Sequence, residues 1–126
     1  MELRTTKDFA IRRSPGENTP TVTVIAGGEE NGPDVGVARV RVPVGASMPA
    51  HRHNGSDVII TAVAGQVSIS DGSASIDVPA GSSAVIGKDE KVSLRNSSDE
   101  SAELIVSAGP ADFLAGIRQW PDPTHS

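Results

Sequence analysis

The sequence predicts an all-β protein, a barrel or jelly roll built from about ten short strands joined by turns. Thirteen glycines and nine prolines mark frequent turns, while the aromatic residues are limited to Phe9, Phe113 and Trp120. A core with so few large rings must be filled by valine, isoleucine, leucine and alanine, and β-branched residues favour strands. Apolar and polar residues also alternate in short runs, which is the pattern of strands with one buried face.

The expected elements follow one another closely along the chain. Residues 1–20 alternate weakly and end in a loop, whereas Asp71-Gly72 is a two-residue hairpin signal. In the tail 110–120 the apolar residues recur at helical spacing, which predicts a short helix packed over the barrel and ended by Pro121. The other expected strands cover residues 21–26, 35–44, 58–63, 66–70, 74–78, 84–86, 91–95 and 102–107.

Two of these strands indicate different environments. Residues 58–63 are almost continuously apolar, so we expect this strand to be covered on both faces. Residues 35–44 instead alternate with period 2 and carry Arg39 and Arg41 on the solvated face. The opposite face, which we expect to be buried, carries Ala38, Val40, Val42 and Val44.

Length and charge limit the possible classes of protein. The chain has 126 residues, which suits one domain spanning residues 1–126, and it has no cysteine, which excludes disulfides and thiolate metal ligands. Its net charge is −5 and its basic residues are scattered, which argues against nucleic acid or an anionic membrane as a partner. The first residues lack the apolar stretch of a signal peptide, and no apolar run approaches the ~20 residues of a membrane helix. We therefore expect a soluble cytoplasmic protein.

The candidate site is built on two of the three histidines, His51 and His53. In extended backbone, side chains two residues apart point to the same face, so both imidazoles are expected to share one metal ion or one substrate. The third histidine, His125, lies next to the C-terminus and is expected to be disordered. We therefore place the chemistry at His51 and His53.

Two segments carry a resemblance to a known family. Gly45, five residues, His51, one residue and His53, followed by a turn, a valine-rich strand and Gly65, resemble the first motif of the cupin superfamily. The segments Pro79-Ala-Gly81, Val85-Ile86 and Val92 to Asn96 resemble its second motif. The resemblance covers about residues 35–108, with N-terminal strands in 1–26 and the tail in 110–126. It implies a small single-domain cupin, a jelly roll or conical β-barrel with a short C-terminal helix.

The resemblance also implies a set of metal ligands, which this sequence matches only in part. The family's site takes two histidines and a glutamate from the first motif and a histidine from the second. His51 and His53 match the first two ligands, the glutamate position falls on Asp57 or Val58, and the last histidine aligns with Val92. A site of His51, His53 and Asp57 is adequate for a divalent metal such as Fe, Mn, Ni or Zn. If Val58 faces inward, however, Asp57 faces outward in a regular strand, and a metal-free pocket is the alternative.

Inward alternation from the histidines predicts an apolar pocket with few polar groups, which is the usual make-up of a small-molecule site. Asn96, which matches the asparagine that closes the second motif, is also expected to hold down a loop. The expected pocket residues are Val58, Ile60, Ala62, Val92, Leu94 and Asn96.

Our leading hypothesis from the sequence is a small-molecule enzyme of isomerase, cyclase or lyase type. In this hypothesis His51 or His53 carries the proton, with or without a weakly bound metal. Two alternatives remain at this point: a metal-dependent dioxygenase using His51, His53 and Asp57, and a non-catalytic ligand-binding or structural cupin. We also expect a homodimer, formed through sheet edges or the N-terminal strand, because dimerisation covers exposed strand edges.

Overall fold

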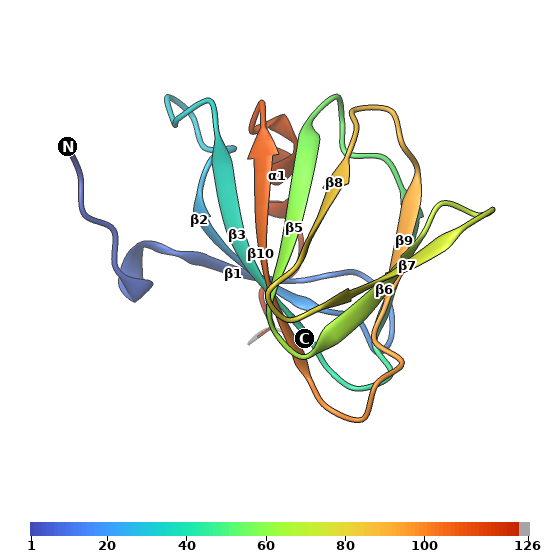
Figure 1. Ribbon diagram of the computed structural model, residues 1–126. Helices are drawn as coiled ribbons and strands as arrows, with labels where there is room; N and C mark the ends of the chain where they lie inside the picture. The colour runs from blue at the N-terminus through green and yellow to red at the C-terminus, as the bar shows by residue number, and fades with distance from the viewer. Residues whose placement is uncertain (124–126) are drawn as a thin grey trace.

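Two antiparallel β-sheets face one another in the computed structural model, which describes residues 1–123 (Figure 1). The larger sheet has the strand order β1-β2-β3-β10-β5-β8 and the smaller one β4-β9-β6-β7. The elements are the 3-10 helix η1 (Thr6–Asp8), β1 (Ala10–Arg13), β2 (Thr21–Ala26), β3 (Gly36–Val42), β4 (Ser47–His51), β5 (Asp57–Ala64), β6 (Gln66–Ser70), β7 (Ser75–Pro79), β8 (Ser83–Ile86), β9 (Val92–Arg95), β10 (Ala102–Gly109) and α1 (Asp112–Ile117). The predicted fold class, all-β with a short C-terminal helix, is confirmed.

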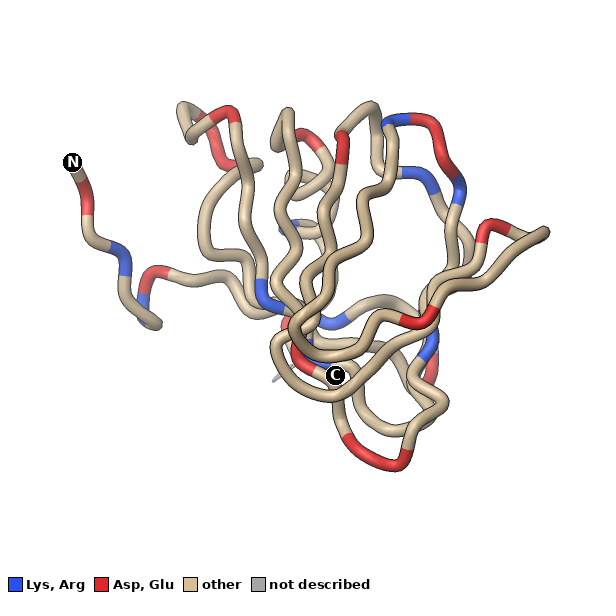
Figure 2. The backbone as a smooth tube through the Cα atoms, viewed as in Figure 1, with Lys and Arg blue, Asp and Glu red and all other residues tan. Residues whose placement is uncertain are grey.

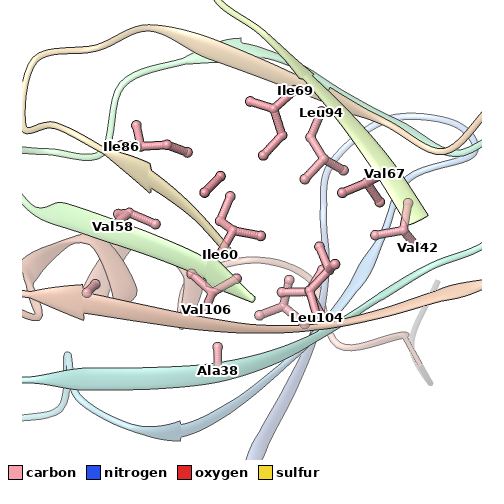
Figure 3. Close-up of a cluster of buried hydrophobic side chains, with 14 of the residues drawn as sticks. Ala38, Val42, Val58, Ile60, Val67, Ile69, Ile86, Leu94, Leu104 and Val106 are labelled. Atoms are coloured by element: carbon pink, nitrogen blue, oxygen red, sulfur yellow. The ribbon is translucent and has the colours of Figure 1, made fainter. Parts of the chain in front are cut away.

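The core fills the space between the two sheets. Side chains of β5 and β10 point toward those of β6 and β9 from the opposite sheet, as Figure 3 shows for Ile60, Leu104, Ile69 and Leu94. Each of these strands buries every second residue, as in β10, where Ala102, Leu104, Val106 and Ala108 are buried. The period-2 alternation of the sequence therefore produces the core directly, because alternate side chains of a strand leave opposite faces of the sheet.

β3 ends earlier than its alternation predicts. Ala38, Val40 and Val42 are buried as expected, but Val44 is 52% exposed, so its predicted burial is wrong. Pro43 follows the strand and has no N–H to donate to a neighbouring strand. The N–H of Ala46 then closes a turn on the Pro43 carbonyl at 3.0 Å, which carries Val44 away from the core.

β5 is covered on one face, so the prediction that both faces are covered is wrong. Val58 and Ile60 are buried between the sheets, whereas Ile59 and Val63 on the outer face are 43% and 54% exposed. The apolar residues of 58–63 therefore belong to two different surfaces, the core and an exposed patch on the outside of the larger sheet.

The hairpin between β6 and β7 has a longer loop than its two-residue signal predicts. Ser70 pairs with Ser75, and residues 71–74 form the connection. The Asp71 carboxylate accepts hydrogen bonds from the N–H groups of Ser73 and Ala74 at 2.9 and 2.8 Å. These bonds lower the pKa of Asp71. They also satisfy backbone N–H groups of a four-residue loop, a loop length that the dipeptide Asp71-Gly72 alone does not indicate.

α1 packs against β10 and β2 (Figure 1). Two glycines, Gly28 and Gly36, allow this close approach because they have no Cβ atom. A Cβ added at Gly36 would lie 2.3 Å from Leu114 Cδ1, and one at Gly28 would lie 2.4 Å from the Ala115 backbone nitrogen. Phe113, Leu114 and Ile117 are buried by this close approach. The helix is shorter than the tail pattern predicts, but it covers the barrel as expected.

Within residues 1–123, no helix has the length and apolar character that crossing a membrane requires. His125, which the sequence predicts to be disordered, lies outside the described residues.

Candidate functional site

The structure brings the two imidazoles into contact. His51 is the last residue of β4, and His53 follows two residues later. Their ring centroids are 4.8 Å apart and the rings are inclined at 63° to each other. Both rings line the same internal cavity, which is the arrangement that the one-residue spacing predicts.

The two rings differ in their surroundings. His53 is only 3% exposed, and its Nδ1 has no hydrogen-bond partner among residues 1–123. Burial, followed by the positive charge of His51, lowers the pKa of His53 to about 4. His53 is therefore neutral at pH 7, because removing an imidazolium from water disfavours its charged form. The neutral His53 ring remains able to form one hydrogen bond with a molecule in the cavity.

His51 is half-buried and its tautomer follows from its contact with the backbone. His51 Nδ1 lies 2.9 Å from the carbonyl oxygen of Pro49. A carbonyl oxygen can only accept, so Nδ1 carries a proton and donates it to Pro49. In the neutral ring, Nε2 is then left with a free lone pair, which makes it a proton acceptor.

Phe113 of α1 completes the surroundings of the pair. Its ring lies edge-on to His53 with centroids 4.7 Å apart, and it stacks on His51 at 6.2 Å. Sequence reasoning placed the helix over the barrel but did not include Phe113 in the site. The signal was present in the helical spacing of Phe113, Leu114 and Ile117, because a helix that covers a barrel end must point its apolar side inward.

The cavity beside the histidines has a volume of about 50 Å³. Four of the six predicted pocket residues line it: Val58, Ile60, Val92 and Leu94. The volume admits a few water-sized groups and is well below the ~150 Å³ of an apolar cavity that takes benzene. It therefore has room for a small group of atoms but not for a whole ring.

The other two predicted pocket residues, Ala62 and Asn96, do not line the cavity. Ala62 is buried in the core further along β5. Asn96 is fully buried, and its amide nitrogen donates to the carbonyls of Val42 and Glu100 at 2.9 and 2.8 Å while its Oδ1 accepts from Ser98. These bonds hold the loop after β9, the role that sequence reasoning also gave to Asn96.

A larger groove of about 320 Å³ lies next to the cavity. The two share one wall, formed by Met48, His51, Phe113, Ile117 and Trp120. The groove is further lined by Ser14, Pro15, Pro49, Arg52, Asn54 and Gly116. His51 therefore stands between an inner cavity that also contains His53 and an outer groove open to solvent.

The residues around the histidines do not fit a resident divalent metal. Asp57 is exposed at the start of β5, while Val58 beside it is fully buried and lines the cavity. Val58, one of the two residues on which the glutamate position falls, and Val92, at the position of the last histidine, are both apolar. In residues 1–123, no group of three histidine, cysteine, aspartate or glutamate side chains could hold a metal ion. Two imidazoles are fewer than the three protein ligands that catalytic metal sites provide.

The comparison with known protein families agrees with this architecture. The profile of the family described as "Cupin domain" matches residues 38–108, more than half of the 126 residues. The chain belongs to the cupin family. No curated protein sequence matches this cupin.

Solved structures resemble this cupin in fold. The polyketide cyclase RemF from Streptomyces resistomycificus is 18% identical with a TM-score of 0.71, over 86% of this chain and 79% of that one. A double-stranded β-helix protein from Klebsiella pneumoniae is 16% identical with a TM-score of 0.69, over 90% and 93% of the two chains. An oxalate oxidase is 25% identical with a TM-score of 0.68, and the match covers 77% of this chain. This cupin spans about half the length of the oxalate oxidase, 54% of that chain.

Proposed function

We propose that this cupin is a small-molecule enzyme of isomerase, cyclase or lyase type, in which His51 and His53 transfer protons. The observation that carries the proposal is His53, whose ring lines an apolar cavity beside His51 while its buried Nδ1 has no partner among the described residues. Buried polar groups are normally hydrogen-bonded, and one left open beside a cavity is suited to a ligand atom.

The chemistry that this pair supports is removal of a proton from carbon next to a carbonyl group. His51 Nε2 accepts the proton as the C–H bond breaks, and the electron pair moves onto the carbonyl oxygen to form an enolate. Neutral His53 donates a hydrogen bond to that oxygen from its protonated ring nitrogen. In an apolar cavity such a bond stabilises developing charge more strongly than water does.

The enolate then leads to each of the three reaction types. Return of the proton to a different atom completes an isomerisation, and departure of a group from the β-carbon completes a lyase reaction. Attack of the enolate carbon on a second carbonyl of the same molecule closes a ring. His51 is half-buried and opens to the groove, so it can exchange the proton with solvent between turnovers.

The test is hydrogen–deuterium exchange at the α-carbons of acetone and cyclohexanone in D₂O, followed by proton NMR. We expect the wild-type protein to accelerate exchange, and His51→Gln and His53→Gln each to lower the rate about 10²-fold or more, the usual size of a general-base contribution. Asp57→Asn is the matched control, because Asp57 is exposed on the outer face. Circular dichroism confirms that each variant is folded.

Two results would overturn the proposal. Exchange at the wild-type rate in both histidine variants would remove the pair from the chemistry, and no exchange by the wild type would leave a ligand-binding cupin without this activity. Equimolar metal in the purified protein, lost in both His53→Gln and Asp57→Asn, would favour the metal-dependent dioxygenase instead. Elemental analysis of the same samples measures this directly.

A further inference from the structure

We infer that the outer groove binds small monocarboxylates with an apolar ring, and that Arg52 recognises the carboxylate. The inference rests on the proposed function, because it names the substrate class of the same site. The two spaces differ in size. The inner cavity of about 50 Å³ admits only a small group, while the groove of about 320 Å³ accommodates a six-membered ring.

The wall of the groove is suited to an apolar body. Met48, Phe113, Ile117 and Trp120 form most of the surface that the groove shares with the cavity, and Pro49 extends it. The backbone N–H of Trp120 donates to the Ile117 carbonyl at 2.9 Å, which fixes the main chain that carries this side chain. A ring lying against these side chains exchanges water contact for apolar contact, which is favourable in proportion to the area buried.

The charge of the groove is opposite to that of the protein as a whole. The chain carries a net charge of −5, and its acidic residues lie mainly in loops around the barrel (Figure 2). Among the described residues that line the groove, however, Arg52 carries the only permanent charge, and none is aspartate or glutamate. A cationic groove on an acidic protein selects an anion.

Arg52 is oriented by the backbone and keeps its charge unpaired. Its Nε donates to the carbonyl of Asp89 at 3.2 Å, which fixes the side of the guanidinium group that faces the protein. Within residues 1–123, no ion pair joins Arg52 to a carboxylate. The terminal nitrogens of a guanidinium can bind a carboxylate with two parallel hydrogen bonds. Arg52 follows the end of β4 at His51, so the regular alternation of side chains along the strand does not set its direction.

His51 and His53 determine which end of the ligand points toward the inner cavity. His51 lines both spaces, and His53, a residue only 3% exposed whose Nδ1 has no partner among the described residues, lines the inner one. A ligand whose carboxylate binds Arg52 and whose ring lies against Trp120 therefore presents a polar group, such as a carbonyl oxygen, to His53.

Trp120 is the only tryptophan of the chain, so its fluorescence reports on the groove directly. We would titrate the protein with cyclohexanecarboxylate and with its uncharged analogue cyclohexanecarboxamide. We expect the carboxylate to change Trp120 emission and to bind at least about tenfold more tightly than the amide. Arg52→Gln should weaken carboxylate binding about tenfold or more and leave amide binding unchanged, and Arg52→Lys should recover only part of the loss because lysine lacks the planar fork.

The matched control is Arg95→Gln, because Arg95 is exposed on β9 and does not line the groove. Equal affinities of the wild type for carboxylate and amide, or unchanged carboxylate binding by Arg52→Gln, would overturn the inference. Because the readout is binding, it is independent of proton transfer. Arg52-dependent binding without ketone exchange defeats only the proposed function, and exchange without such binding defeats only this inference.

Discussion

His53 is a polar side chain in an apolar cavity, and its burial makes the stability of the fold depend on pH. The unfolded chain binds a proton at this residue near pH 6.5, whereas the folded protein binds it only near pH 4. Above pH 6.5 both states are neutral at His53 and the residue causes no pH dependence. As pH falls from 6.5 to 4, the unfolded state gains protons that the folded state does not, so stability decreases.

We predict that the free energy of unfolding falls by about 3 kcal/mol between pH 6.5 and 4 because of His53, from about 1.4 kcal/mol per pKa unit. Urea unfolding of the wild type and of His53→Leu across this range measures the effect. The variant should lose this part of the slope, while the contribution of the carboxylates remains in both proteins. Parallel pH profiles for the two proteins would show that His53 is not held neutral by the fold.

At the same scale, the register of β5 decides whether Asp57 can act as a metal ligand beside the histidines. Asp57 and Val58 are neighbours in sequence, but only Val58 faces the cavity. Because side chains alternate across a strand, a shift of one residue would turn the Asp57 carboxylate toward the cavity in place of the Val58 methyl groups. The start of β5 at Asp57, paired with Gly109 of β10, fixes that register.

At the scale of elements, the site depends on how closely α1 approaches the barrel. Phe113, Ile117 and Trp120 belong to this helix and the residues that follow it, and they separate the cavity from the groove. The approach is allowed by Gly28, where backbone atoms of α1 occupy the place of a Cβ. Gly28 also has φ +82°, a conformation that other residues rarely adopt.

We predict that Gly28→Ala displaces α1 and destabilises the protein by at least about 2 kcal/mol more than Gly55→Ala. Gly55 is the matched control because its φ is +80°, yet a Cβ there would meet nothing within 4 Å, so only the conformational strain remains. Urea unfolding measures the difference, and a red shift of Trp120 emission reports the displaced helix. Equal destabilisation by the two substitutions would mean that the close packing of α1 is not what requires glycine at position 28.

At the scale of the whole molecule, the larger sheet leaves an apolar patch on its outer face. Val85 of the edge strand β8 is 75% exposed and pairs with Ile59, and Val63 lies on the same face of β5. Charged residues and prolines usually protect an edge strand such as β8 from pairing with another chain. An apolar edge strand that lacks them promotes association. We propose that a second copy of the chain covers this patch, which would make the protein a homodimer.

We predict that Val85→Lys converts a dimer into a monomer in sedimentation velocity experiments, because a lysine placed in a self-complementary interface buries its charge twice. Val44→Lys is the matched control, since Val44 is also exposed but lies in the turn after β3. A wild type that sediments as a monomer, or a Val85→Lys variant that remains dimeric, would contradict this assembly.

The sequence by itself determined the fold class and the histidine pair. Alternation of apolar residues in short runs specifies strands, because this rule depends only on local backbone geometry. The one-residue spacing of His51 and His53 indicated a shared side, although β4 ends at His51 and the contact of the two rings depends on the turn that follows. The exposed outer face of β5 could not be predicted in this way, because an apolar run does not show which of its faces another layer covers.

Only the tertiary structure decided how the site is completed. The orientation of Asp57 depends on the pairing of β5 with β10. The position of Phe113 depends on the packing of α1 against Gly28 and Gly36. Arg52 joins the groove because β4 ends one residue before it. These are contacts between segments far apart in sequence, and their geometry is set by packing of the whole core, which local patterns do not encode.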